Sequence, residues 1–163
     1  RNLCFRSDRR FLHTEMGHQY RMTNMQAAVG VNQIGRIEDI VARKRAISAA
    51  YTDRLSDLNG IQLPSEEPWA RSVYWVYSLL LVEDHPLDAV SFAAALKELG
   101  IETRPFFLGM HEQPVFREQG LFHGESYPVT EYIARKGLYI PSGMAITEVQ
   151  MDQVATAVRN ILT

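Results

Sequence analysis

Hydrophobic residues recur every three or four positions through a long early stretch of the chain, which is the spacing of one helix face. The stretch begins at Thr23, and Gln26 three residues later completes a capping-box signature of a helix start. Gly60 predicts the end, because glycine readily takes the left-handed conformation that closes a helix. At about 1.5 Å per residue the helix would span roughly 50 Å, so we expect it to bend near Gly30 or Gly35, or to bridge two domains. Its apolar positions are Ala28, Val31, Ile34, Ile37, Val41, Ile47, Tyr51, Leu55 and Leu58.

The next segments predict a strand and a helix that follow a connecting loop. Val73–Val82 is rich in aromatic and aliphatic residues, which favours a strand buried on at least one face. Asp84, with Pro86 in the first turn, predicts a helix start. This helix should run through Leu99 and close at Gly100.

The last third of the chain predicts two more strands and two more helices. Pro105 interrupts the first of these strands and indicates an edge or a bend, because proline cannot donate to a sheet ladder. Thr147 with Gln150 is a second capping box. We expect a strand over residues 101–107, a loop over 108–126, a helix over 128–136 closed by Gly137, a strand over 138–140 and a helix from 147 to 161. This order predicts an α+β domain with a small sheet covered by helices.

Composition and charge narrow the functional classes. The 163 residues, 46% hydrophobic and 22% charged, are enough for one sizeable core. A formal net charge of −2 provides no basic field for nucleic acid or an anionic membrane. The absence of a long apolar run and the single Cys4 lead us to expect neither membrane span nor disulfide, and a cytoplasmic location. His13, His18, His85 and His123 lack metal-ligand spacing, so we expect no metal site.

Four blocks of sequence resemble one known family. They are GHQYRMTNMQAAVG from Gly17, YWVYSLLLV from Tyr74, GIETRPFF from Gly100 with the following Met110-His111 and Pro114, and GLYIPSG from Gly137. Their order and spacing resemble the C-terminal domain of the DegT/StrS family of pyridoxal phosphate (PLP) sugar aminotransferases. The TRPFF block, with the methionine-histidine pair and the proline after it, is most similar to the branch that makes perosamine.

The resemblance implies a domain organisation. Residues 1–22 would be a remnant of the large PLP domain, 23–60 a long connecting helix, and 61–163 the C-terminal small domain of a fold-type I aminotransferase. Because the first residue is Arg and the family's cofactor lysine precedes the first block, we expect this chain to be a portion of a longer enzyme.

The resemblance also implies a cofactor contact at Gln19, Tyr20 and Arg21, which would reach the PLP phosphate of a neighbouring subunit in a homodimer. Arg21 lies just before a capped helix start, and a guanidinium beside that positive helix end is suited to a dianion. Alternatively, Arg21 pairs with a carboxylate such as Glu15. The family's usual residue at position 19 is asparagine, which is one methylene shorter than Gln19.

A second set, Arg104, Phe106, Phe107 and His111, is implied to line the substrate pocket for a sugar nucleotide. An arginine beside aromatic residues can grip a diphosphate and pack against a hexose. Alternatively, both phenylalanines belong to the core and His111 caps a loop. Trp75 stands where many relatives have histidine, so no ligand contact is transferred to it.

The three lysines, Lys44, Lys97 and Lys136, are each expected on a helix surface rather than bound to PLP. No catalytic residue is therefore predicted here, and the chain alone should be inactive. The complete enzyme is expected to pass an amino group from glutamate, through PLP, to a 4-keto-6-deoxy sugar nucleotide. Two alternatives stay open: a PLP-dependent sugar 3-dehydratase of the same family, and a noncatalytic module that dimerises or binds sugar nucleotides.

Overall fold

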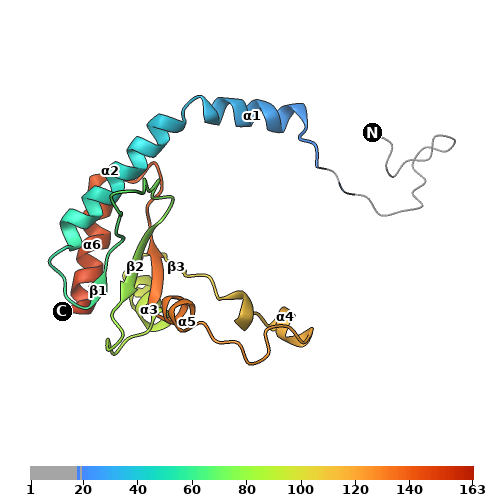
Figure 1. Cartoon of the computed structure of the whole chain (residues 1–163). Coiled ribbons are helices and arrows are strands. Elements are labelled where there is room, and N and C mark those ends of the chain that lie inside the picture. Colours follow the sequence, from blue (N-terminus) through green and yellow to red (C-terminus); the bar gives the residue numbers. More distant parts are fainter. Residues whose placement is uncertain (1–17, 19) are drawn as a thin grey trace. The chain divides into compact units, whose positions relative to one another are not determined.

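The computed structural model describes residue 18 and residues 20–163 of the chain (Figure 1). The chain divides into two compact units, with the boundary between Ile37 and Glu38. Each unit is described by itself.

The described part of the first unit contains helix α1, Asn24–Ile34. The predicted capping box is confirmed: the Gln26 backbone N–H donates to the Thr23 hydroxyl over 3.3 Å, and the Thr23 N–H donates to the Gln26 side chain over 2.9 Å. The helix ends where the Gly35 N–H donates to the Val31 carbonyl. Where we expected a bend near Gly30 or Gly35, the helix therefore stops at Gly35.

The second unit contains all of α2, Ile37–Leu55, except its first residue. The single helix expected over residues 23–60 is therefore two helices, and α2 stops short of the predicted end. It ends five residues before Gly60. Ile47, Tyr51 and Leu55 recur every fourth residue and are almost fully buried. This is the spacing that places side chains on one helix face.

A four-stranded antiparallel sheet supports this unit (Figure 1). Its order is β1 (Ile61–Gln62), β2 (Tyr77–Leu81), β4 (Gly137–Ile140) and β3 (Arg104–Pro105). Pro105 thus lies on an edge strand, as predicted. The other elements are α3 (Ala89–Glu98), the 3₁₀ turn η1 (Met110–Glu112), α4 (Pro114–Glu118), α5 (Pro128–Lys136) and α6 (Glu148–Leu162).

The core lies between one face of the sheet and helices α2, α3 and α6. Its largest fully buried side chains are Tyr51, Tyr77, Phe92, Ile47, Leu55, Leu79, Leu81, Leu96, Leu138, Met151 and Val158. Arg54 of α2 also forms ion pairs with Glu148 and Asp152 of α6. The predicted α+β class, a small sheet with helices, is confirmed.

Several predicted boundaries are wrong. Strand β2 starts at Tyr77 rather than Val73, because Tyr74 has a positive φ of 45° that breaks the extended backbone. Helix α3 begins at Ala89, and Asp88 caps it instead of Asp84 by accepting from the Ser91 N–H over 2.8 Å. Strand β3 has two residues, and the expected loop over 108–126 contains η1 and α4.

Other boundaries are confirmed. Helix α5 matches its predicted range, and β4 starts one residue early at Gly137. Thr147 and Gln150 form the second capping box, and α6 extends one residue beyond Ile161. Gly100 takes φ 78° and closes α3 as expected.

The chain between β1 and β2 is fixed to α2 by Arg45. Its guanidinium donates to both carboxylate oxygens of Glu66, over 2.7 and 2.8 Å, and lies 5.6 Å from the Tyr74 ring centroid. The hydrogen bonds from Arg45 and from the Ser72 backbone hold the pKa of Glu66 at about 2. Trp75, which follows Tyr74, is 70% exposed.

Candidate substrate-binding site

The face of the sheet that points away from the core carries Arg104 at its edge. Arg104 pairs with Tyr139, and Tyr139 pairs with Ser78, so these three side chains lie on one face. Arg104 is exposed, and the other two are half-buried. On the opposite face, Leu79 and Leu138 are buried in the core.

Two phenylalanines that follow Arg104 gather around Tyr139. The Phe106 ring stacks on it with centroids 4.6 Å apart, and the Phe107 centroid lies 6.3 Å away. Phe106 also covers Gly137, where a Cβ atom would lie 2.5 Å from the Phe106 ring and 2.7 Å from the Ile133 carbonyl oxygen. Phe106 is therefore a fixed, half-buried support, whereas Phe107 is 74% exposed.

The structure thus brings together three of the residues singled out in the sequence, Arg104, Phe106 and Phe107. It adds Tyr139, which sequence reasoning missed. The signal was present: in Leu138-Tyr139-Ile140 the alternation of a strand directs the middle side chain away from the face that the other two bury.

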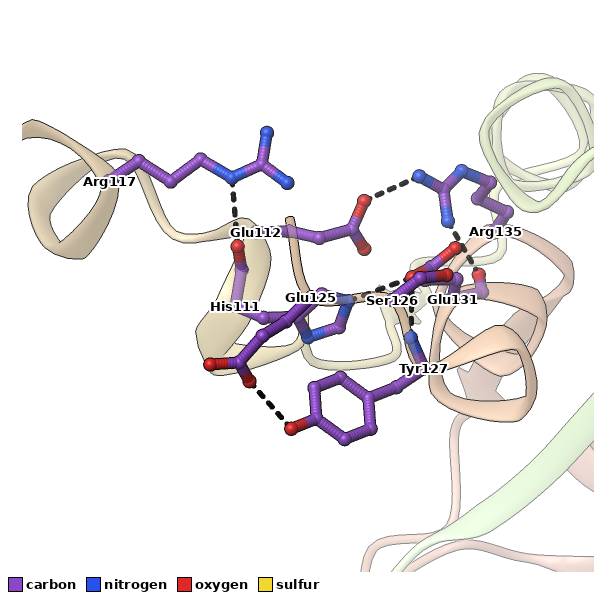
Figure 2. Close-up of polar contacts among 8 residues, drawn as sticks. All are labelled: His111, Glu112, Arg117, Glu125, Ser126, Tyr127, Glu131 and Arg135. Carbon is purple, nitrogen blue, oxygen red and sulfur yellow. Dashed lines mark hydrogen bonds and ion pairs between the residues drawn. The ribbon is translucent and has the colours of Figure 1, made fainter. Parts of the chain in front are cut away.

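His111 has a different environment from Arg104. Its side chain is 4% exposed, and its Nε2 lies 3.1 Å from Oε1 of Glu131 on α5 (Figure 2). The Tyr127 ring meets the imidazole edge-on with centroids 4.9 Å apart. In this conformation His111 ties the segment between β3 and α5 to the helix, which corresponds to the alternative role of fixing a loop.

Glu131 is the acceptor on which this tie depends. Its Oε1 accepts from the Tyr127 N–H over 2.8 Å and from the Ser126 hydroxyl over 3.0 Å, in addition to His111 (Figure 2). These hydrogen bonds, with the Tyr127 backbone contributing most, hold the pKa of Glu131 below its usual range. Sequence reasoning missed Glu131; its only signal was an acidic residue in the first turn after Pro128.

Two further contacts hold the same segment (Figure 2). Arg135 of α5 donates to Glu112 Oε1, and the Arg117 Nε donates to the His111 carbonyl over 2.8 Å. Glu112 Oε2 is buried with no hydrogen-bond partner among the described residues. Polar contacts therefore fix this segment to α5.

The lysines differ from the surface expectation at two of three positions. The Lys44 ammonium donates to the Ser142 carbonyl, and burial lowers its pKa. Lys136 donates to the carbonyls of His85 and Leu87 over 2.7 and 3.1 Å. Both are half-buried because their nitrogens satisfy loop carbonyls, whereas Lys97 is exposed as expected.

Of the predicted cofactor contacts, Gln19 lies outside the described residues, as does Glu15, the alternative partner of Arg21. Tyr20 and Arg21 are exposed in the first unit, just before the Thr23 cap of α1. An exposed guanidinium next to the start of an eleven-residue helix fits a phosphate dianion.

In the part of the chain that the structure describes, we looked for membrane-spanning helices and for groups of metal ligands. No helix there combines the length and the hydropathy needed to cross a membrane. In the same residues, no three His, Cys, Asp or Glu side chains group in a way that could hold a metal ion.

Comparison with known proteins defines the class. Residues 1–159 match the DegT/DnrJ/EryC1/StrS aminotransferase family, and the chain belongs to this family. GDP-perosamine synthase of Caulobacter vibrioides is 30% identical over 156 residues, covering 95% of this chain and 41% of that protein. GDP-perosamine synthase of Vibrio cholerae is 28% identical over 93% of this chain and 41% of its own length.

Solved structures share the fold. DesI, determined in the presence of its TDP-sugar product, superimposes with a TM-score of 0.75 at 25% identity, covering 87% of this chain and 36% of that one. The E. coli GDP-4-keto-6-deoxy-D-mannose-3-dehydratase, with bound hydrated PLP, gives 0.74 at 18% identity, over 91% of this chain and 38% of that one. This chain spans about two fifths of the length of the curated relatives that it matches.

Proposed function

We propose that this chain is the C-terminal portion of a PLP-dependent aminotransferase that acts on a nucleotide-linked 4-keto-6-deoxy sugar, with glutamate as amino donor. The observation that carries the proposal is the match of nearly the whole chain to two proteins named GDP-perosamine synthase. The complete enzyme is proposed to work as a cytoplasmic homodimer.

PLP is the cofactor of the proposed enzyme. When bound, it supplies the electron sink that allows an amino group to leave a donor and reach a keto sugar. Tyr20 and Arg21, with Gln19, would hold its phosphate. None of the three lysines of this chain is proposed to bind it covalently, so the lysine must come from elsewhere in the complete protein.

The chain's own contribution to substrate binding is proposed to be the outer face of the sheet. Arg104 offers an exposed guanidinium, suited to the diphosphate of a sugar nucleotide. Beside it, the exposed Phe107 ring provides an apolar surface for a hexose or a base. Tyr139, on which Phe106 stacks, lies next to that ring, and His111 fixes the segment that follows.

Two alternative functions are a sugar 3-dehydratase and a noncatalytic module. The fold is shared with a 3-dehydratase, so architecture does not separate amination at C4 from dehydration at C3. A noncatalytic module that dimerises or binds sugar nucleotides would bind without turnover.

One reaction assay distinguishes the three functions. The complete protein is incubated with PLP, glutamate and GDP-4-keto-6-deoxymannose, and the products are identified by mass spectrometry. We expect 2-oxoglutarate together with a GDP-linked amino sugar. A product that has lost the C3 oxygen would identify the dehydratase, and binding without any product would identify the noncatalytic module.

Replacing Arg104 tests the substrate assignment. In the complete enzyme, Arg104→Ala should lower kcat/KM for the sugar nucleotide by about tenfold or more, the effect of losing one charge-assisted contact of about 1.4 kcal/mol. Steady-state kinetics measures this, and the absorbance of bound PLP should not change.

A matched control for that measurement is Arg36→Ala, which removes another exposed arginine, outside the sheet. It should leave kcat/KM unaltered. If Arg104→Ala lowers only the melting temperature, Arg104 has a structural role and the assignment is wrong.

A further inference from the structure

Glu131 lies where both ends of one long connection meet. We call residues 106–127 the β3–α5 connection. His111 binds Glu131 from the early part of this connection, and Ser126 and Tyr127 bind it from the end, all through the single oxygen Oε1 (Figure 2). One carboxylate on α5 therefore closes the connection on itself.

The His111 ring, held by Glu131, also restricts the backbone that precedes it in the chain. A Cβ atom at Gly109 would lie 2.5 Å from Cε1 of His111, so the ring packs directly against the Gly109 backbone. Because His111 is buried and hydrogen-bonded, the turn η1 cannot shift without breaking the contact with Glu131.

The residues held in this way are apolar and exposed. Phe107 is 74% exposed and Met110 is 63% exposed, and both lie in the segment that follows strand β3. Apolar burial of these two side chains therefore contributes little to their position. Their position relative to Arg104 is set by Phe106 on one side and by the His111–Glu131 contact on the other.

We infer that Glu131 is a positioning residue for substrate binding, which acts through His111 to hold Phe107 and Met110 in place for contact with the sugar nucleotide. This inference rests on the proposed function. Glu131 itself does not touch the substrate. Its loss should affect recognition of the sugar nucleotide and leave recognition of the amino donor unchanged.

The test compares Glu131→Ala with Glu131→Gln in the complete enzyme. The alanine variant removes the acceptor, whereas the glutamine carbonyl can still accept from the same three donors. We expect Glu131→Ala to raise the KM for GDP-4-keto-6-deoxymannose by about tenfold, with the KM for glutamate within about twofold of wild type, and Glu131→Gln to restore most of the loss.

The matched control is Glu125→Gln. Glu125 is an exposed carboxylate of the same connection and, among the residues that the structure describes, accepts only from the Tyr127 hydroxyl, over 2.6 Å. It should leave both KM values unchanged. Should Glu131→Ala not fold, Ser126→Ala removes one donor to the same oxygen and is expected to raise the sugar-nucleotide KM by about threefold.

Hydrogen exchange separates failure of this inference from failure of the proposed function. Exchange of the amides in residues 107–113 should be faster in Glu131→Ala than in wild type or Glu131→Gln. If exchange accelerates but the sugar-nucleotide KM stays unchanged, or if both KM values rise equally, the positioning role is wrong although the enzyme function stands. If the wild-type enzyme converts no sugar nucleotide, the proposed function fails, and the inference fails with it.

Discussion

Addition of PLP to the 163-residue chain, followed by borohydride reduction, is expected to label none of the three lysines stoichiometrically. A covalent link requires an unprotonated lysine amine that can reach the PLP carbonyl. Lys136 donates to two carbonyls, and Lys97 is an exposed residue of α3. The complete enzyme should instead be labelled at one lysine outside these 163 residues.

Lys44 is the lysine most able to contradict this expectation, because burial lowers its pKa and increases the fraction of free amine. However, its ammonium donates to the Ser142 carbonyl, and forming a covalent link would leave that acceptor unsatisfied. Peptide mapping by mass spectrometry after reduction measures labelling at each site. Stoichiometric labelling of one lysine would overturn the expectation, whereas weak labelling of all three would show only surface reactivity.

Local signals explain why several elements were predictable. Thr23 with Gln26, and Thr147 with Gln150, form capping boxes that satisfy backbone donors without help from distant residues. Pro128 fits the first turn of α5, where a missing N–H costs nothing. These three helix starts depend on residues a few positions apart, so the sequence alone contains the necessary information.

Other boundaries depend on contacts between distant residues. Asp84 and Asp88 have the same capacity to cap a helix, but the carbonyls of His85 and Leu87 accept from the Lys136 ammonium at the end of α5, and α3 begins only after Asp88. Strand β2 is shortened by Tyr74, whose ring contacts Arg45 on the distant helix α2. Neither tertiary contact is visible in local propensity.

The candidate site also combines features that the local sequence predicts with features that depend on distant contacts. Arg104 and Phe106 were identified through a motif, and the pairing of β3 with β4 explains their position. The burial of His111 and its contact with Glu131, twenty residues later, require the β3–α5 connection to fold back on α5. A histidine and a glutamate at this separation have no characteristic spacing, so the sequence did not indicate their partnership.

Arg21 is proposed to bind the PLP phosphate in a neighbouring subunit's cofactor site. In the complete enzyme, Arg21→Ala should weaken PLP retention, because losing a charged phosphate contact costs about 1.5 to 3 kcal/mol. The fold should persist, since Arg21 is exposed and Thr23 and Gln26 still cap α1. PLP retained after dialysis measures the loss.

Mixing subunits then tests whether the contact crosses the dimer. A variant lacking the cofactor lysine is inactive, and Arg21→Ala is weakened, but a heterodimer of the two carries one site with both the lysine and the arginine intact. Activity should therefore recover well above that of either variant alone when PLP is limiting. Arg36→Ala, exposed and beyond α1, should retain PLP normally and serves as the control. If mass spectrometry shows that heterodimers form while the mixture stays as inactive as its parts, Arg21 serves its own subunit and the cross-subunit assignment is wrong.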